Sequence, residues 1–415
     1  MQVSSEIGRL KQVIVHRPDE GIARVSPKRA EELLFDDIVY LPQMQEEHDV
    51  FTDVLRAFLG KENVLNTDKL LAEAIAADKE VTEEVIDLII QDEELPKVYK
   101  EKLLALDNKE LAEVLVTGYL KKEDYFLYDP IPNFLFTRDI AVTVNDHVVI
   151  TKPAKEARHR ENFLARFIFS VHPIFAHLRK EGRLINMNHV EEFPPSRKGE
   201  PVFIEGGDMM IVNSDYLLIG CSERTSAHAI HLLRDKLFKE KVVKNVVQVN
   251  IPKERTCMHI DTVFTLINNT HTVCFKPIVV DGLASNVEVH KINSTSKFYH
   301  SIRDFMLNEI NPNMQFILAG NGESPYQERE QWTDGCNLVA IKPGVAITYD
   351  RNPHTETAFK KAGYKILHAR KFLKDLKAKK IKIEDIENTI ITLPSNELSR
   401  ARGGSHCMTC PIERE

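Results

Sequence analysis

The sequence predicts an α/β protein built from about five similar units with one helical insertion. Three observations lead to this prediction. A strand–turn–strand pattern followed by a helix recurs along the chain, its strands are rich in β-branched residues, and one long segment departs from the repeat because it has helical spacing throughout. If such units are arranged about an axis, the first residues of each strand pair come together at one end.

Four strand pairs carry the repeat. Their turns contain residues that tight turns favour: Asn-Asp, Asn-Ser-Asp, Asn-Asn-Thr and Pro-Gly. The pairs occupy 138–153, 205–221, 259–277 and 333–363, the last including its helix. The helices are predicted at about 156–169, about 226–238 and after Pro353. The N-terminal strand segment LKQVIVHRP brings the number of units to about five.

The segment 67–123 interrupts this pattern. It is rich in Leu, Ala, Glu and Lys with helical spacing, and it has no glycine before Gly118. We interpret it as several short helices that pack as a small bundle within the repeat body. We therefore expect two parts, an α/β body at 1–66 and 124–415 and a helical bundle at 67–123. Scaffolding, an oligomer contact or a lid is the expected role of the bundle.

The composition is typical of a globular protein in the cytoplasm. Of 415 residues, 43% are hydrophobic and 28% are charged, and the formal net charge of −7 does not favour nucleic acid or an acidic membrane as a partner. The N-terminus has no apolar signal-peptide core, and no apolar run approaches the 18 or so residues of a membrane span. Six scattered cysteines then indicate reduced thiols.

The segment CMTC at 407–410 has several interpretations. A redox pair needs a following helix, but the sequence runs only five residues beyond Cys410. A zinc site needs more ligands, and there is no second CxxC. An unreactive cysteine also remains open. Gly403 and Gly404 let a ligand approach the backbone closely, which favours Cys407 as a single nucleophile.

Each strand pair begins with residues able to do chemistry. These are Asp139, then Glu205 with Asp208, then His259 with Asp261, and finally Asp334. On a strand, His259 and Asp261 share a face, which suits acid–base chemistry and cation binding, although such a pair alone is more often structural. No third or fourth metal ligand accompanies it.

Several carboxylates around a thiol suit a reacting group that is a cation. Acyl-transfer enzymes stabilise an oxyanion instead, so carboxylates would oppose that chemistry. A guanidinium has a planar fork of N–H donors that matches carboxylates. Arg158 and Arg224, a short distance downstream of two of the pairs, would then bind an anionic end of the same substrate.

The ordered set of segments resembles the arginine deiminases. The segments are SEIGRLKQVIVHRP, LLFDDIVYLPQMQEEHDVF, NFLFTRD, ARHREN, FIEGGD, GCSERTS, MHIDTVF and RARGGSHCMTCP, and they span nearly the whole chain. The family belongs to the guanidine-modifying superfamily, with amidinotransferases, dimethylarginine dimethylaminohydrolases and agmatine deiminases. The resemblance implies a five-bladed pseudo-symmetric α/β propeller of ββαβ modules, with a helical bundle inserted after the first module.

The resemblance also implies an activity. L-arginine and water would give L-citrulline and ammonia through a covalent cysteine S-alkylthiouronium intermediate, without metal or cofactor. Cys407 would attack the guanidinium carbon, and His259 would protonate the departing ammonia and then activate water. Asp139 and Asp261 would grip the guanidinium nitrogens. Glu205 would hold the guanidinium and orient His259.

Five further residues would bind the rest of the substrate. By the same resemblance, Arg158 and Arg224 would bind the substrate carboxylate, while Asn133 and Phe136 would shape the site around the substrate's tail end. Arg402 resembles a mobile gate residue. The superfamily resemblance and the inserted bundle also lead us to expect a homo-oligomer, a dimer or larger.

Three details of the nucleophile loop are expectations for the structure. Family members often have glycines where this chain has Ala401 and Ser405, and a positive φ at Ala401 would hinder the loop. Glu6 is expected to pair with Arg402 when the site is empty. Nearby acids should raise the pKa of the Cys407 thiol, so the thiolate is expected to form only with substrate bound.

Other functions remain open from the sequence. A related guanidine hydrolase or amidinotransferase would act on another arginine-like substrate, although Arg158 and Arg224 argue against agmatine because agmatine has no carboxylate. A catalytically silent relative is the non-enzymatic alternative, and loss of a catalytic residue would have indicated it. A thiol redox protein would use Cys407 and Cys410 as a reversible pair.

Overall fold

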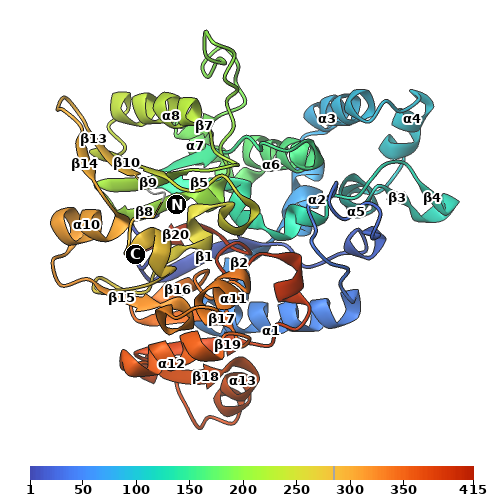
Figure 1. Ribbon diagram of the computed structural model, residues 1–415. Helices are drawn as coiled ribbons and strands as arrows, with labels where there is room; N and C mark the ends of the chain where they lie inside the picture. Colours follow the sequence, from blue (N-terminus) through green and yellow to red (C-terminus); the bar gives the residue numbers. More distant parts are fainter. Residues whose placement is uncertain (284–285) are drawn as a thin grey trace.

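Five sheets of the structure repeat one connection pattern (Figure 1). The computed structural model describes residues 1–283 and 286–415. In each of the five sheets, two antiparallel strands are joined by a third that lies parallel to one of them, and the chain passes through at least one helix before this third strand. The predicted α/β class is therefore confirmed, and each of these sheets with its helices is called a module below.

Each of the five sheets contains three to five strands. The first sheet, in the order β2-β1-β20, contains β1 Leu10–Val15, β2 Val64–Asn66 and β20 Cys410–Arg414. The second contains β5 Ala141–Val144, β6 His147–Ile150 and β7 Leu184–Asn186. The third contains β8 Met209–Asn213, β9 Tyr216–Cys221, β10 Asn245–Asn250, β13 Asn286–Lys291 and β14 Lys297–Tyr299. The fourth contains β11 Phe264–Leu266, β12 His271–Cys274 and β15 Gln315–Leu318. The fifth contains β16 Val339–Lys342, β17 Val345–Tyr349, β18 Lys365–His368 and β19 Thr389–Leu393.

The α-helices fall into two groups. Those of the modules are α1 Leu41–Leu59, α6 His159–Val171, α7 Ala176–Lys180, α8 Ala227–Lys239, α9 Lys276–Val279, α10 Ile302–Phe305, α11 Tyr326–Trp332, α12 Pro353–Lys361 and α13 Ala369–Lys377. Those between the first and second modules are α2 Thr67–Ala77, α3 Lys79–Asp92, α4 Val98–Leu104 and α5 Asn108–Thr117.

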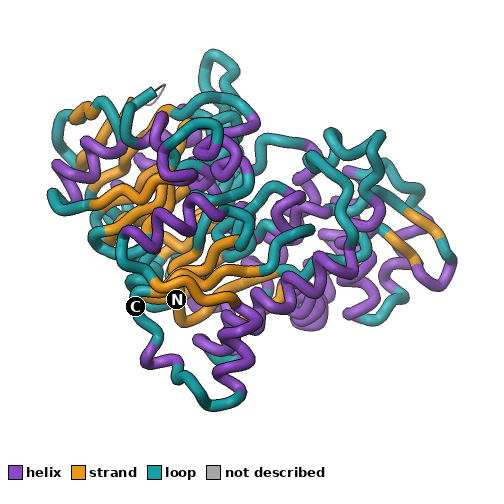
Figure 2. The backbone as a smooth tube through the Cα atoms, turned by 60° about the horizontal axis from the view of Figure 1, so that its bottom comes forward, coloured by secondary structure: helices purple, strands orange, loops and turns teal. Residues whose placement is uncertain are grey.

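The first sheet joins the two ends of the chain. Strand β20 runs antiparallel to β1, with Leu10 opposite Arg414 and Ile14 opposite Cys410. Figure 2 shows the N- and C-termini side by side at this sheet. The sequence predicted the strand LKQVIVHRP without a partner, and its partner is the strand that follows Cys407.

The helices α2 to α5 extend from the body of sheets (Figures 1 and 2). Leu71, Ile86 and Leu115 from this group share one hydrophobic core with Leu164 and Phe169 of α6. Truncating a buried phenylalanine such as Phe169 to alanine typically costs about 3–5 kcal/mol. A short hairpin, β3 Tyr119–Leu120 with β4 Tyr125–Phe126, crosses the predicted boundary at 123. The division into two parts stays a prediction.

Local sequence explains where the helices of this group begin and end. Asn66 caps α2 by accepting the Asp68 N–H, and Asp107 with Glu110 forms a capping box at the start of α5. Helix α5 ends at Gly118, which has φ +70°, and a Cβ atom there would lie 2.3 Å from the Tyr128 carbonyl oxygen. Both features require glycine at this position.

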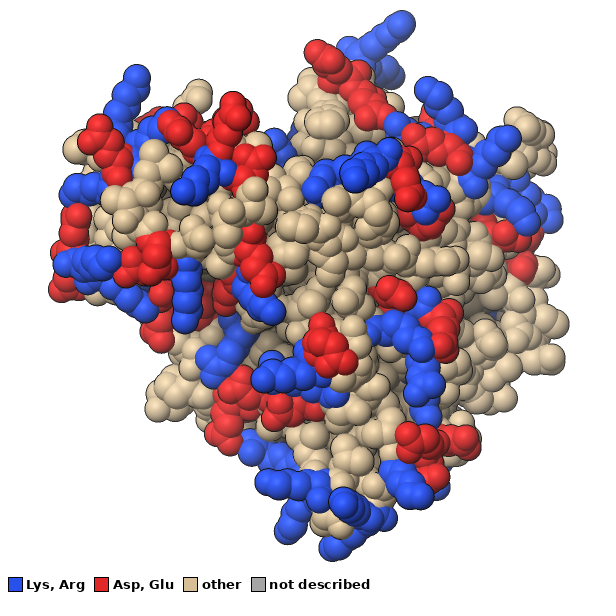
Figure 3. Space-filling view, turned by 180° about the vertical axis from the view of Figure 1, so that it is seen from behind, with Lys and Arg blue, Asp and Glu red and all other residues tan. Residues whose placement is uncertain are grey.

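Charges of both signs are mixed on the surface of the molecule. On the face shown in Figure 3, Lys and Arg side chains alternate with Asp and Glu side chains. Among the described residues, no helix is both long and apolar enough to cross a membrane.

His48 on α1 should make the fold sensitive to acid. Its side chain is fully buried, and neither ring nitrogen has a hydrogen-bond partner within residues 1–283 and 286–415. Burial, reinforced by the charge of His16, lowers its pKa from 6.5 to about 3. Between these values the unfolded chain binds more protons than the native one, so stability is lost as the pH falls below 6.5. The loss is about 2 kcal/mol at pH 5.

We expect His48→Leu to remove this loss. The measurement is the melting temperature at pH 7.5 and at pH 5, with His177→Leu, at an exposed histidine of α7, as the matched control. The wild type and the control should lose more stability on acidification than His48→Leu. An equal loss in all three proteins would contradict the assignment of a neutral buried His48.

Candidate active site

The site residues lie in the turns that lead into the modules. Asp139 ends the short 3-10 helix η5 (Thr137–Asp139) before β5, and Glu205 precedes η8 (Gly206–Asp208) before β8. His259 precedes η10 (Ile260–Thr262) before β11, Asn337 lies two residues before β16, and Cys407 lies three residues before β20. The five modules thus contribute one residue each to a network of contacts.

One small cavity collects most of the predicted site. Its volume is about 30 Å³, which has room for a few water molecules at most. Eight of the ten predicted residues line it: Asn133, Phe136, Asp139, Arg158, Arg224, His259, Arg402 and Cys407. Glu205 and Asp261 do not line it but contact two that do, His259 and Cys407. The sequence therefore identified residues that come together, while their roles stay predictions.

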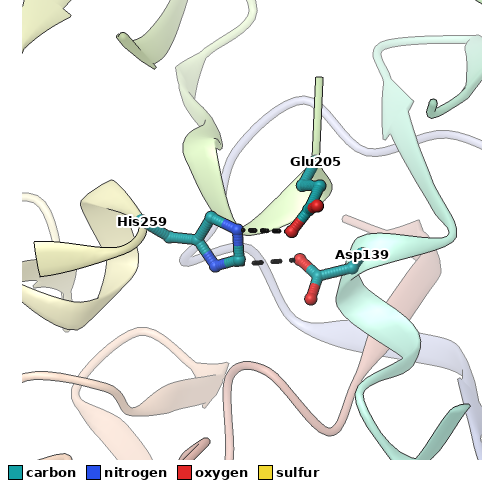
Figure 4. Close-up of side chains that lie close together, drawn as sticks. All are labelled: Asp139, Glu205 and His259. Carbon is teal, nitrogen blue, oxygen red and sulfur yellow. Dashed lines mark hydrogen bonds and ion pairs between the residues drawn. The ribbon is translucent and has the colours of Figure 1, made fainter. Parts of the chain in front are cut away.

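The His259 ring faces two carboxylates, those of Glu205 and Asp139 (Figure 4). Its Nε2 is 2.9 Å from Glu205 Oε2, and its Nδ1 is 4.0 Å from Asp139 Oδ1. Burial alone would lower the pKa of this histidine, but the charge of Asp139 and the hydrogen bond with Glu205 raise it to about 9. At neutral pH the ring is therefore an imidazolium that can give up a proton.

Arg158 occupies the carboxylates of the site. Its Nη1 is 2.6 Å from Asp139 Oδ2 and 3.5 Å from Glu205 Oε2, and its Nη2 is 2.8 Å from Glu161 Oε2. Arg224 Nη1 lies 3.6 Å from the same Glu205 oxygen. Burial would raise the pKa of Glu205, but the His259 hydrogen bond and the charges of Arg224 and Arg158 lower it below its usual range. These carboxylates thus already hold a guanidinium.

The Cys407 thiol has two polar neighbours. Asp261 Oδ2 is 3.4 Å from Sγ, and Asn337 Nδ2 is 3.2 Å from it. Burial, followed by the charges of Asp261, Asp139 and Asp334, raises the pKa of the thiol well above its usual value. Cys410 instead contacts Ala141 and belongs to a different hydrophobic core from Cys407. This separation disfavours a Cys407–Cys410 redox pair.

The outer residues hold the loops over the cavity. Asn133 Nδ2 donates to the Leu33 carbonyl oxygen at 2.8 Å. Phe136 packs against Gly403 so closely that a Cβ atom there would lie 2.3 Å from the ring. Arg402 stacks on the Trp332 ring, with its Cζ 3.3 Å from the ring centroid.

The expected partner of Glu6 was wrong, and the condition named for Ala401 is not met. Glu6 does not pair with Arg402 but lies 3.3 Å from His406 Nε2 and 3.5 Å from Arg138 Nη1, because it is buried beneath the nucleophile segment. Ala401 does not have a positive φ, because it lies in the short helix η14 (Leu398–Ala401). The residue with the left-handed conformation is Arg402, with φ +62°.

A group of ligand atoms suited to a metal ion exists in the site. One atom each from Asp139, Glu205 and His259 lie within 4.8 Å of one another, and in the described part of the chain this is the one such group found. Two of the three residues also contact the Arg158 guanidinium, a cation that needs the same oxygens.

Several residues of the site were not assigned from the sequence. Asp208 accepts the Ile260 N–H at 2.9 Å, and burial raises its pKa to about 7. His406 bridges Asp261 and Glu6. Adjacency to Cys407 was the available signal for His406. Asp334, another leading residue, is buried with φ +62° but does not line the cavity. Asn337 looks like an ordinary turn residue in the sequence.

Two solved structures share the fold of this chain. The N-terminal domain of ArgZ, solved covalently bound to a reaction intermediate, aligns with a TM-score of 0.52 and 13% identity over 97% of this chain and 98% of that chain. A dimethylarginine dimethylaminohydrolase aligns with a TM-score of 0.50 and 13% identity over 97% of this chain and 100% of the other. At such identities the similarity shows the fold alone, which belongs to the α/β class.

Sequence comparison identifies the family within this class. The family model described as arginine deiminase matches residues 31–123 and 110–414. An arginine deiminase of Bacillus cereus (strain B4264) is 35% identical over 100% of this chain and 98% of its own length, and one of Listeria monocytogenes (strain CLIP80459) is 33% identical with the same coverage. The chain belongs to the arginine deiminase family.

Gly207 should be essential for the position of His259. A Cβ atom on Gly207 would lie 2.6 Å from His259 Nδ1 and 2.8 Å from its Cγ, near the fixed root of the ring. Gly207→Ala should therefore displace the ring, and a displacement of about 1 Å costs about 100-fold in rate. The measurement is kcat with L-arginine, beside the control Lys198→Ala at an exposed turn. Wild-type kcat in folded Gly207→Ala would contradict this geometry.

Proposed function

We propose that this chain hydrolyses L-arginine to L-citrulline and ammonia with Cys407 as the nucleophile. Its membership of the arginine deiminase family supports the reaction. The observation that supports the nucleophile is a buried thiol in the same cavity as the His259 imidazolium and the carboxylate Asp139. Thiol, proton donor and cation-binding groups are the parts that displacement of ammonia from a guanidinium requires.

The substrate guanidinium would take the place that the Arg158 guanidinium occupies. Arg158 contacts Asp139 and Glu205, the carboxylates proposed to hold the substrate. Because the cavity has room for a few water molecules at most, a molecule the size of arginine enters only if side chains move. We propose that Arg158 turns to the substrate carboxylate beside Arg224, and that Asn133, Phe136 and the gate residue Arg402 shape the remaining space.

The reaction would proceed in two displacements. The Cys407 thiolate attacks the guanidinium carbon, the C–N bond breaks, and the His259 imidazolium gives its proton to the departing ammonia. The neutral His259 then takes a proton from water, whose oxygen attacks the thiouronium carbon. The C–S bond breaks and its electron pair returns to sulfur. The proton left on the hydroxyl oxygen is released to solvent, where ammonia takes it up as ammonium, and neutral citrulline leaves. Asp139, Asp261 and Glu205 stabilise the cationic carbon centre throughout.

Substrate binding would itself generate the thiolate. In the empty site, burial and the acids raise the pKa of the Cys407 thiol well above its usual value. A bound guanidinium adds a positive charge between the thiol and the carboxylates, which lowers the pKa of the thiol. The nucleophile is then charged only when its target is present, and this limits unproductive reactions of the free enzyme.

The arrangement of the whole molecule is part of the proposal. We propose that the five ββαβ modules surround an axis as a five-bladed propeller, and that 67–123 is a separate helical unit. The convergence of one leading residue from each module supports the propeller. We also propose a homo-oligomer in the cytoplasm that uses no cofactor.

Product analysis by mass spectrometry tests the function. Purified protein is incubated with L-arginine, agmatine, dimethylarginine or arginine plus glycine, beside Cys407→Ala. We expect citrulline and ammonia from L-arginine alone, and a loss of at least about 10⁴-fold in the variant, because removing a nucleophile removes the covalent path. Turnover of a different guanidine would assign another substrate. Full turnover by Cys407→Ala would contradict the nucleophile.

A chelator tests whether the ligand group in the site holds a catalytic metal. We expect kcat to be unchanged after exhaustive treatment with EDTA, and unchanged on addition of Zn²⁺ or Mn²⁺ at micromolar concentration, because Arg158 and the substrate guanidinium supply the cation at Asp139 and Glu205. Loss of activity in EDTA that a metal restores would contradict the metal-free mechanism.

A further inference from the structure

Asn337 connects the nucleophile segment to the rest of the site. Its side chain is 1% exposed and makes four hydrogen bonds. Oδ1 accepts from the backbone N–H groups of His406 at 3.1 Å and Cys407 at 3.3 Å. Nδ2 donates to the Asp261 carbonyl oxygen at 3.1 Å and to Cys407 Sγ at 3.2 Å. The partners fix the orientation of the amide, since a backbone N–H only donates and a carbonyl oxygen only accepts.

The two contacts of the sulfur respond in opposite ways to loss of its proton. The neutral thiol donates to Asp261 Oδ2, but a thiolate at 3.4 Å from that carboxylate is repelled by it. The Asn337 N–H, by contrast, bonds more strongly to a charged acceptor than to a neutral one. In the part of the chain that the structure describes, this is the one side-chain donor that hydrogen-bonds to Sγ.

Several charged or titratable groups surround the Cys407 sulfur. These groups are Asp261, Asp139, Asp334, Tyr349, His259 and Arg402. Three of them are carboxylates that oppose a thiolate. Arg402 and His259 are the cations, but neither makes a hydrogen bond to Sγ. A neutral donor at 3.2 Å therefore has an effect that the distant charges cannot replace.

We propose that Asn337 is a catalytic residue that stabilises the Cys407 thiolate, both as the attacking group and as the leaving group. This inference rests on the proposed role of Cys407. In the second displacement the C–S bond breaks and its electron pair moves to sulfur, where the Asn337 N–H accommodates the new charge. The same amide holds the backbone of the loop through Oδ1, so the sulfur and its donor keep the same relative position.

The close approach of Asn337 also explains a glycine of the loop. A Cβ atom on Gly404 would lie 2.5 Å from Asn337 Oδ1 and 2.6 Å from its carbonyl oxygen. Because the amide must reach both backbone N–H groups, residue 404 has no room for a side chain. Asparagine is suited to this place because one planar group supplies both an acceptor for the backbone and a donor for the sulfur.

Asn337→Asp tests the proposal with little change of shape. The carboxylate keeps the acceptor for the two backbone N–H groups and loses the donor to Sγ. Below the pKa of the thiol, the rate of alkylation by iodoacetamide follows the thiolate fraction, and one pKa unit changes that fraction tenfold. We expect both this rate at pH 8 and kcat/KM for L-arginine to fall at least about tenfold.

Two further variants separate this role from a structural one. Asn162→Asp, which changes a buried amide that donates to the Thr151 carbonyl oxygen, should leave both rates unchanged. Asn337→Ser removes the amide donor without adding charge and should also slow alkylation, and it serves as the test if Asn337→Asp does not fold. A purely structural brace predicts faster alkylation, because a loosened loop exposes the thiol.

The outcomes distinguish the inference from the proposed function. If Cys407→Ala is inactive while folded Asn337→Asp and Asn337→Ser are alkylated as fast as the wild type, the role of Asn337 is overturned and the nucleophile stands. If Cys407→Ala turns over arginine, the nucleophile itself is overturned.

Discussion

The pairing of β20 with β1 is the interaction on which the site depends. Because β20 begins three residues after Cys407, the register that sets Ile14 opposite Cys410 also sets the position of the thiol. Further contacts, such as the Arg138 N–H to the Cys407 carbonyl oxygen at 3.0 Å, fix the loop only once the strand is in place. A slip of one residue would turn every side chain of β20 to the opposite face and withdraw Cys410 from its core. The N-terminal strand β1 thus positions the Cys407 thiol near the C-terminus.

Balance of buried charge is the second constraint. Asp139, Glu205 and Asp261 are each less than a tenth exposed, and a buried carboxylate without a counter-ion costs several kcal/mol. In this structure Arg158 is the counter-ion of Asp139 and Glu205, while Asp261 Oδ2 forms a hydrogen bond of 2.8 Å with His406 Nδ1. A guanidinium that replaced Arg158 would keep this balance. If one guanidinium replaces the other, the carboxylates of the site keep a cationic partner throughout the exchange.

Local sequence patterns predicted much of the fold but not the pairing of its N-terminal and C-terminal strands. The strand pairs and their turns are visible because alternation and turn residues act over a few positions, and the acids, His259 and Cys407 stand out by chemistry. The β1–β20 pairing joins segments about 400 positions apart, which no local pattern encodes. The partners of Glu6 could not be inferred for the same reason. Asn337 was missed because an asparagine in a turn is common, and its importance comes from the sulfur that tertiary structure places beside it.

The conformation of Arg402 shows which part of the closed cavity is least firmly held. A non-glycine residue with φ +62° carries a strain of about 1–3 kcal/mol, which the surrounding contacts must offset. Those contacts are weak: the guanidinium stacks on Trp332 and donates to the Arg255 carbonyl oxygen, and its Nε lies 3.8 Å from Asp36 Oδ2. Its Nε and Nη1 have no hydrogen-bond partner among the described residues. Burial also lowers the pKa of this arginine. Arg158, by comparison, has three carboxylate partners. Because the cavity must enlarge before arginine can enter, we propose that Arg402 moves first, since its weaker contacts make its movement less costly than that of Arg158. That order opens the site while Arg158 still neutralises the carboxylates.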